Sequence, residues 1–226
     1  MKLSMLIKES IKKILPLNNN FIRYFYYPRF RNWMNEHKNE GKTFNNRYQL
    51  YDYLNNEYLN NKPINYLEFG VYQGDSLKYW TNLNKVNESR FWGFDTFEGL
   101  PEAWKEGNNT KHSAGAFNVA GNLPDITDNR VSFVKGLFQD TLDSFLKLYE
   151  SKGNLIIHND SDLYTSSLFL LTRCNNIIIP GTIVIFDELS SWMNEFKALE
   201  EYCSAYYRTF RILGKTQNFA EVAIIF

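Results

Sequence analysis

From Pro63 onwards, short apolar segments alternate with segments that have the spacing of amphipathic helices. Seven segments have strand character: Ile64–Phe69, Arg90–Phe94, Val131–Lys135, Asn154–Asn159, Thr182–Phe186, Arg208–Gly214 and Glu221–Phe226. Helices are expected to begin near Asp75, Asp140, Thr165 and Ser191. Such alternation predicts an α/β fold, in which helices cover both faces of a mostly parallel, seven-stranded sheet. Only a short polar turn separates the last two strands, so they are expected to form an antiparallel hairpin at the end of the sheet.

The 226 residues suffice for one substantial domain with a buried core. We assign residues 63–226 to this domain, and residues 1–62 to a helical, aromatic segment that caps it or contacts a second copy. Residues 2–15 have apolar side chains at helical spacing, with lysines on the opposite face. Packing against the protein itself or a second subunit is favoured over a membrane surface, and the aromatic run from Phe21 to Trp33 favours a homodimer. A second helix is expected from Phe44 to Asn60, with Thr43 as its cap.

Composition excludes several classes of protein. Lys plus Arg and Asp plus Glu number 25 each, so no overall positive charge would attract nucleic acid. The chain contains neither an uncharged apolar run of the roughly 18–20 residues that a membrane span needs, nor a signal peptide pattern. Cys174 and Cys203 have no disulfide or zinc spacing, which favours reduced thiols in a cytoplasmic protein.

The first chemical motif is a glycine turn at the end of the first parallel strand. It contains Glu68, Gly70 and Gly74, followed by a helix whose first N–H groups are free. The spacing differs from the GxGxxG turn that binds the pyrophosphate of dinucleotides, and the Glu68 carboxylate would repel a pyrophosphate. A carboxylate suits a ligand with an amino or sulfonium group, although a simple tight turn has the same appearance.

The second motif places Asp95 after the second parallel strand. In doubly wound folds, an acidic residue at this position binds the ribose hydroxyls of an adenosine cofactor. This role fits NAD and S-adenosylmethionine equally well. A turn or helix-cap aspartate is the alternative.

Two acidic pairs follow two later strands. Asp160 and Asp162 follow one strand, and Asp187 and Glu188 follow the next. If these strands are neighbours, about 4.8 Å apart, the four carboxylates converge at the ligand-binding edge of the sheet. Clustered carboxylates repel one another and need protons or a cation, and an all-oxygen cluster suits Mg²⁺. Two separate caps are the alternative, but the placement of both pairs at strand ends favours a metal.

The stretch from Leu100 to Arg130 is rich in Gly, Asn and Pro and has no clear period. Long irregular insertions in compact domains are commonly lids or binding loops, so residues 101–128 are expected to cover the site. His112 in this loop could contact the substrate, but a solvated side chain is favoured. His158 is expected to be a core residue of its strand.

Together, these segments resemble the macrocin O-methyltransferase family of sugar-modifying enzymes. The resemblance rests on LEFGVYQGDS, GFDTFEGLPE, VKGLFQDTL, NDSDLYTSS and PGTIVIFDE, and it covers about residues 63 to 192 in the same order. It implies a Rossmann-like class I methyltransferase fold, S-adenosylmethionine as cofactor and a divalent metal, usually Mg²⁺. It also implies that a sugar hydroxyl is methylated, on a glycosylated metabolite, a nucleotide sugar or a polysaccharide.

The resemblance further implies roles for individual residues. Asp160, Asp187 and Glu188 correspond to the metal-binding residues, although Glu188 is one methylene longer than the aspartate we consider typical. Asp162 corresponds to the general base. The cofactor-binding motifs contribute Glu68, Gly70, Val71, Tyr72, Gly74, Ser76, Asp95, Thr96, Phe97, Gly136 and Phe138.

Two other functions stay open at this point. A metal-dependent glycosyltransferase could use Asp160 and Asp162 as a DxD motif, but it would leave the glycine turn and Glu68 without a role. A non-catalytic S-adenosylmethionine-binding protein would keep the fold, but carboxylates stand at all four expected positions.

Overall fold

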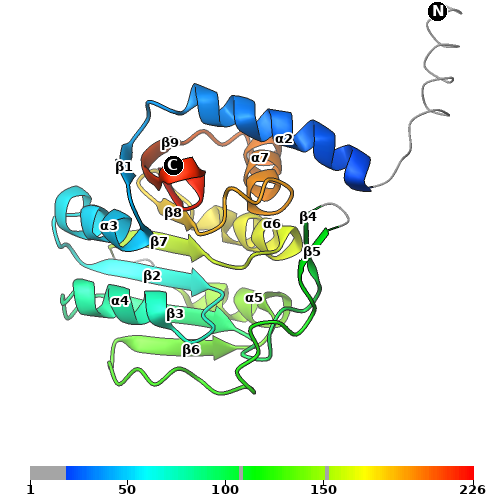
Figure 1. Ribbon diagram of the computed structural model, residues 1–226. Coiled ribbons are helices and arrows are strands. Elements are labelled where there is room, and N and C mark those ends of the chain that lie inside the picture. The colour runs from blue at the N-terminus through cyan, green and yellow to red at the C-terminus, as the bar shows by residue number, and fades with distance from the viewer. Residues whose placement is uncertain (1–18, 107–108, 151–152) are drawn as a thin grey trace, which may run out of the picture.

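The computed structural model describes residues 19–106, 109–150 and 153–226 (Figure 1). An eight-stranded sheet has the order β1-β9-β10-β8-β7-β2-β3-β6. Its strands are β1 (Lys42–Phe44), β2 (Ile64–Phe69), β3 (Arg90–Asp95), β6 (Val131–Lys135), β7 (Asn154–Asn159), β8 (Ile183–Phe186), β9 (Arg211–Thr216) and β10 (Val222–Ile225). β4 (Trp104–Glu106) and β5 (Asn109–His112) form a separate antiparallel pair.

Helices lie on both faces of the sheet (Figure 1). One face carries α3 (Arg47–Asp52), which continues as a π-helical segment (Tyr53–Tyr58), and α4 (Asp75–Leu83). The other carries α5 (Phe138–Leu148), α6 (Tyr164–Arg173) and α7 (Glu195–Tyr206), with α2 (Asn19–Glu36) packed against α7. Short 3₁₀ turns occupy Cys174–Asn176 and Gln217–Phe219. The predicted α/β architecture is therefore confirmed.

The sheet differs from the prediction in two ways. It has eight strands rather than seven, because β1 pairs in parallel with β9 at the edge. β1 has three residues, and a segment of this length is too short to show a recognisable alternating pattern. The antiparallel strand also lies inside the sheet, because β10 pairs with both β8 and β9.

The helix expected from Phe44 to Asn60 is shorter at both ends. Thr43 and Phe44 belong to β1, and the cap is Asn46, whose side chain accepts the Gln49 N–H at 3.0 Å. The start expected near Ser191 lies at Glu195, because residues 187–194 form a folded loop. Part of the irregular stretch from Leu100 to Arg130 is the β4–β5 hairpin.

The N-terminal helix expected over residues 2–15 lies outside the described residues. In α2, Phe30 is buried and Trp33 packs on Phe196 of α7, whereas Tyr24 and Tyr27 are exposed. No helix in the described ranges is both long and apolar enough to cross a membrane. The division at residue 62, the homodimer and the cytoplasmic location stay predictions.

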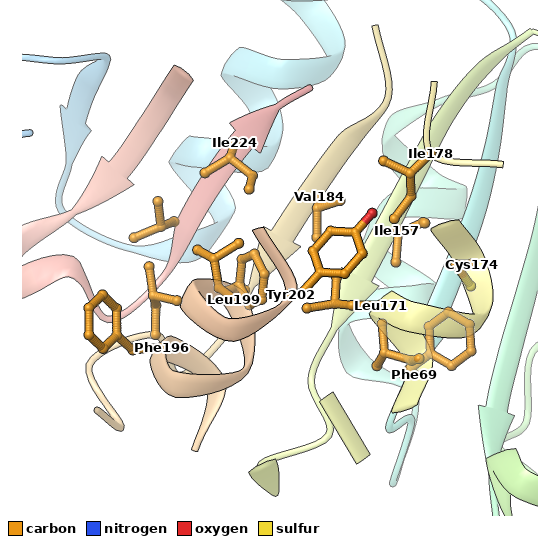
Figure 2. Close-up of a cluster of buried hydrophobic side chains, with 14 of the residues drawn as sticks. Phe69, Ile157, Leu171, Cys174, Ile178, Val184, Phe196, Leu199, Tyr202 and Ile224 are labelled. Carbon is orange, nitrogen blue, oxygen red and sulfur yellow. The ribbon is translucent and has the colours of Figure 1, made fainter. Parts of the chain in front are cut away.

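Apolar side chains from the strands and helices fill the space between the sheet and α5–α7 (Figure 2). Phe69, Ile157 and Val184 project from three neighbouring strands and are fully buried. They meet Leu171 of α6 and Leu199 of α7. Strands buried on both faces lack strict alternation, and this is the pattern of the central segments.

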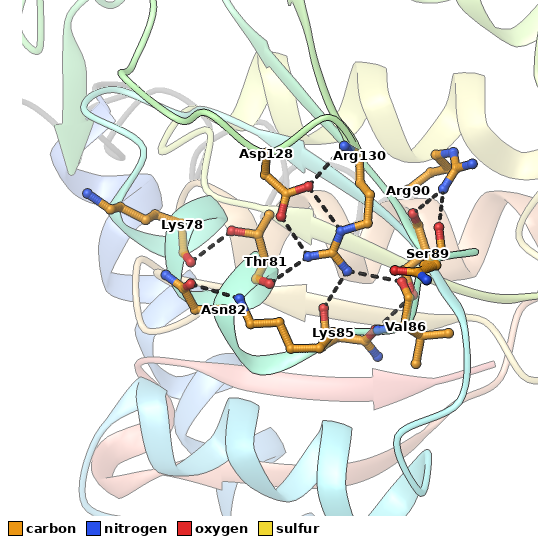
Figure 3. A network of polar contacts seen from close by, with 11 residues as sticks. Lys78, Thr81, Asn82, Lys85, Val86, Ser89, Arg90, Asp128 and Arg130 are labelled. Carbon is orange, nitrogen blue, oxygen red and sulfur yellow. Dashed lines mark hydrogen bonds and ion pairs between the residues drawn. The ribbon is translucent and has the colours of Figure 1, made fainter.

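On the opposite side, Arg130 fastens the end of α4 to the start of β6 (Figure 3). All five of its N–H groups donate hydrogen bonds of 2.7–3.0 Å, to the carbonyls of Thr81, Asn84 and Val86 and to both Asp128 oxygens. The guanidinium is largely buried, so it would be costly to leave these acceptors unpaired.

We predict that Arg130→Met lowers the free energy of unfolding by about 3 kcal/mol, because a buried, fully bonded cation is lost. Arg90→Met is the matched control. Arg90 is exposed and, among the described residues, donates to the nearby carbonyls of Asn87 and Ser89, so its loss should change stability by no more than about 0.5 kcal/mol. Urea unfolding of both variants measures the difference, and equal midpoints would contradict this role of Arg130.

Candidate active site

A cavity of about 650 Å³ opens at the carboxyl ends of the central strands. Its walls come from the turns after β2 and β3, the β4–β5 hairpin, the start of α5, and the loops after β7 and β8. This edge is the usual ligand-binding edge of an open α/β sheet. It contains most of the polar side chains that the sequence singles out.

Strand register brings the acidic residues together. Phe69, Asn159 and Phe186 are aligned across β2, β7 and β8. The next residues along these strands, Gly70, Asp160 and Asp187, therefore form one row. Backbone hydrogen bonds continue through this row, from Asp160 N–H to Phe69 (2.9 Å) and from Asp187 N–H to Asn159 (3.0 Å).

Glycine is required at position 70 because the backbone of Asp160, at the end of the neighbouring strand β7, approaches it closely. The φ of Gly70 is +92°, and a Cβ at this position would lie 1.9 Å from the carbonyl oxygen of Asp160. No other residue type fits without displacing β7. The turn therefore exposes backbone rather than a side chain to the cavity.

Asp95 organises the turns after β2 and β3. Its Oδ2 accepts the N–H groups of Val71 (2.8 Å) and Tyr72 (2.9 Å), and its Oδ1 accepts that of Phe97 (2.7 Å). Tyr72 and Phe97 both have positive φ, which costs energy for side chains of this size. The carboxylate thus holds two strained turns at the cavity wall.

The two aspartates of this row, Asp160 and Asp187, are called the acidic row below. They lie close to a buried histidine. His158, Asp160 and Asp187 each offer a ligand atom, and these atoms lie within 4.8 Å of one another. The Nε2 of His158 is 3.7 Å from Asp187 Oδ1, and its Nδ1 is 2.7 Å from the Tyr66 hydroxyl, which also donates to Glu68. Arg47 of α3 approaches the same Asp187 oxygen at 3.0 Å.

These contacts control the charges of the cluster. Burial alone would lower the pKa of His158, but the nearby carboxylates of Asp187 and Glu68 outweigh it and raise that pKa to about 10. Burial would likewise raise the pKa of Asp187, but His158 and Arg47 hold it below its usual value. Burial, assisted by Asp187, raises the pKa of Asp160 well above its usual value. The row therefore combines one ionised carboxylate with one that favours a proton.

Asp162 follows the row and lines the cavity. Its φ is +62°, an unusual conformation for an aspartate within a short turn. Burial and the neighbouring Glu188 carboxylate raise the pKa of Asp162 to about 7. Within the described residues, no hydrogen bond or ion pair holds its carboxylate.

A model of the macrocin O-methyltransferase (TylF) family matches residues 46–209. The chain belongs to the macrocin O-methyltransferase family. This membership confirms the enzyme class expected from the motifs, an O-methyltransferase, over the glycosyltransferase and non-catalytic alternatives. The match begins one residue before Arg47 and includes both acidic pairs.

Solved structures share the fold of this family member. CalS11, a calicheamicin methyltransferase, is 24% identical with a TM-score of 0.62, over 79% of this chain and 78% of its own. A second CalS11 structure, described as a TDP-rhamnose 3′-O-methyltransferase, is 22% identical over the same shares, with a TM-score of 0.56. The O-methyltransferase NovP is 22% identical, with a TM-score of 0.61 over 79% and 78%.

A fourth structure aligns over nearly the whole chain. The SAH-bound methyltransferase PaMTH1 of Podospora anserina is 13% identical with a TM-score of 0.50, over 99% of this chain and 94% of its own. These likenesses confirm the class I methyltransferase fold. No curated protein sequence matches the chain.

Most of the residues that the family resemblance implies lie in the cavity. Those that line it are Gly70, Val71, Tyr72, Asp95, Thr96, Phe138, Asp160, Asp162, Asp187 and Glu188. Glu68, Gly74, Ser76, Phe97 and Gly136 do not line it. Glu68 is 1% exposed and lies two residues before Gly70, opposite His158 of β7, where it accepts the Tyr66 hydroxyl at 2.7 Å. Glu188 lines the cavity but stands outside the three-residue cluster.

Sequence reasoning did not identify several residues of this O-methyltransferase site. Arg47 has no motif of its own and reaches the cavity only because α3 packs on the sheet. His158 is buried as expected, but it contacts the acidic row rather than only the core. Lys111 and His112 of β5 line the cavity. His112 is exposed, as expected, and it also belongs to the wall of the site. Lys111 lies in the irregular stretch without a motif of its own, and the sequence does not distinguish it from Lys105.

Proposed function

We propose that this enzyme transfers a methyl group from S-adenosylmethionine to a sugar hydroxyl and that it uses a divalent metal, with Mg²⁺ the expected ion. One observation carries the proposal. The glycine turn and the carboxylates of Asp160, Asp162, Asp187 and Glu188 open into the same cavity of a macrocin O-methyltransferase family member. One cavity can therefore place a cofactor beside an acidic, metal-binding surface.

The part of the cavity that is lined by the turns after β2 and β3 has the features of an adenosine-cofactor site. Gly70, Val71 and Tyr72 present turn backbone to it, and Asp95 stands at the end of the second parallel strand. A carboxylate accepts up to about four hydrogen bonds, so Asp95 can hold the turns and still accept from ribose hydroxyls. PaMTH1, which has the same fold, is described as SAH-bound. This agreement supports S-adenosylmethionine as the methyl donor.

The acidic row fits a divalent cation. Asp187 Oδ1 is buried and, within the described residues, lacks a well-aligned hydrogen-bond donor although Arg47 and His158 are near. Asp160 is half-buried beside it and also lines the cavity, and two adjacent carboxylates without a cation repel each other. Asp160, Asp187 and Glu188 would hold the ion, and oxygen donors of this kind suit Mg²⁺.

The chemistry of the residues then follows. A bound divalent cation would lower the pKa of a hydroxyl group placed against it. Asp162, whose carboxylate is held by no described partner, accepts the hydroxyl proton. The acceptor oxygen bonds to the methyl carbon as the carbon–sulfur bond breaks, and the electron pair remains on sulfur. Trp104, His112 and Phe117 enclose the cavity and hold the two substrates in position.

The proposed acceptor is a sugar on a glycosylated metabolite, a nucleotide sugar or a polysaccharide. CalS11 is described as a TDP-rhamnose 3′-O-methyltransferase, which supports a glycosyl hydroxyl. Trp104 and Phe117 are aromatic residues of the cavity wall. Regiochemistry depends on how the sugar lies in the cavity relative to Asp162.

Asp95→Ala should weaken S-adenosylmethionine binding about 10- to 100-fold, because a charge-assisted acceptor is lost and two turns are released. Isothermal titration with S-adenosylmethionine measures the change. Asp75→Ala, a change of the same type at the exposed start of α4, should bind normally. Unchanged affinity in a folded Asp95→Ala protein would refute this role, and wild type that binds a nucleotide sugar but no S-adenosylmethionine would point to a glycosyltransferase.

Methyl transfer should stop when EDTA removes divalent ions and should return when Mg²⁺ is added. The reason is that Asp160 and Asp187 converge on a site that suits a cation. Product formation in a coupled methyl-transfer assay reports both steps. Full turnover by metal-free enzyme would show that the acidic row has another purpose.

Asp162→Asn should fold, bind S-adenosylmethionine and keep its metal, yet turn over about 10²–10⁴-fold more slowly, because only the proton acceptor is removed. Asp160→Asn should instead weaken the metal site, with part of the activity recovered at high Mg²⁺. Initial rates across a Mg²⁺ series distinguish the two. Near-normal turnover of Asp162→Asn, beside an Asp160→Asn enzyme that no Mg²⁺ concentration rescues, would reverse the assignments.

A further inference from the structure

A fifth carboxyl group lies behind the acidic row. Glu195 is the first residue of α7 and is 0% exposed. Its Oε2 accepts the backbone N–H of Glu188 at 3.0 Å. Its Oε1 is buried as well and has no hydrogen-bond partner within the described residues. The side chain does not line the cavity, and its hydrogen bond within the described residues is to the backbone of the acidic pair.

Glu195 is in an unfavourable position for an acidic residue. Burial raises its pKa well above the usual value, and the carboxylate of Asp187 raises it further. A neutral side chain of the same shape would avoid both the loss of solvation and the repulsion. A costly buried group in a folded protein indicates a local requirement that outweighs its cost.

The first turn of a helix is a common place for an acidic residue, since the positive end of the helix dipole attracts it. An exposed side chain satisfies that attraction equally well. Glu195 instead turns away from solvent and bonds outside its own helix, to a residue seven positions earlier. The helix dipole alone therefore does not account for its orientation.

The hydrogen bond from the Glu188 N–H to Glu195 lies at the start of the loop between β8 and α7. The N–H of Asp187 is held by Asn159 of β7 (3.0 Å), and that of Leu189 is held by Ala220 (2.8 Å). The amide between them belongs to Glu188 and is held by Glu195. Asp187 and Glu188 are adjacent in the chain, and both line the cavity. The orientation of the peptide between them sets the direction of both side chains.

We propose that Glu195 is a positioning residue for the acidic pair: its carboxyl group fixes the Asp187–Glu188 peptide so that both side chains face the cavity. The inference rests on the proposed function, in which this pair holds a divalent ion. Residues that orient metal ligands without touching the metal commonly change metal affinity about 10- to 100-fold when they are replaced. The same magnitude is expected here.

The test compares two substitutions of similar size. Glu195→Met fills the space but accepts no hydrogen bond, whereas Glu195→Gln keeps the acceptor and removes the charge. Glu200→Ala is the control on the same helix, because its carboxylate pairs with Arg29 of α2 near the surface rather than with the loop. Affinity for Mn²⁺ alone is measured from the paramagnetic resonance signal of the free ion. Calorimetry with S-adenosylmethionine and amide exchange at Glu188 are measured on the same proteins.

Glu195→Met should bind Mn²⁺ about 10- to 100-fold more weakly than wild type, exchange the Glu188 amide faster and bind S-adenosylmethionine normally. Glu195→Gln and Glu200→Ala should resemble wild type in all three measurements. Unchanged Mn²⁺ affinity in Glu195→Met would overturn the inference. Equal losses in Glu195→Gln and Glu195→Met would also overturn it, because charge rather than position would then matter. Wild type that binds no Mn²⁺ would instead overturn the metal part of the proposed function, and the purpose of Glu195 with it.

Discussion

The parallel pairing of β2, β7 and β8 is the constraint on which the site depends. Their register aligns three strand ends, so residues that are 90 and 27 positions apart in sequence become neighbours in the row Gly70, Asp160 and Asp187. A one-residue slip would turn every side chain to the other face of the sheet. Buried apolar side chains on both faces oppose such a slip. The apolar core therefore specifies the positions of the carboxylates as well as the stability of the fold.

A row of carboxylates inside a protein also needs positive charge. Two resident cations supply it, because Arg47 and His158 both lie within 4 Å of the same Asp187 oxygen. Arg47 comes from α3 and also contacts Glu221, which precedes β10, while His158 lies two residues before Asp160 on β7. The negative charge of the acidic row is thus compensated by His158 from within the sheet and by Arg47 from α3. The cavity side is left for a ligand.

The sequence predicts the strands well, because most of the seven segments are apolar and buried, and their ends match the observed strands within about three residues. Predicting both acidic pairs at one edge needs only the rule that parallel strands end together. The positions of Arg47, Lys111 and Glu195 could not be predicted in this way, since each depends on how a helix or hairpin packs against a distant loop. β1 was missed because three residues carry too little pattern. β10 was misplaced because adjacent strands can be inserted into a sheet as well as added to its end.

The internal position of β10 determines the order in which the sheet can be completed. Among the described strands, β9 pairs with β1 and β10 alone, so neither β1 nor β9 can join the sheet before β10 has paired with β8. During synthesis from the N-terminus, β8 therefore keeps an open edge until the last strand of the sheet has left the ribosome. Long-range pairings of this kind form slowly, and exposed edges invite aggregation. Because Glu221 lies next to β10, the contact that steadies Arg47 beside the acidic row is also among the last to form.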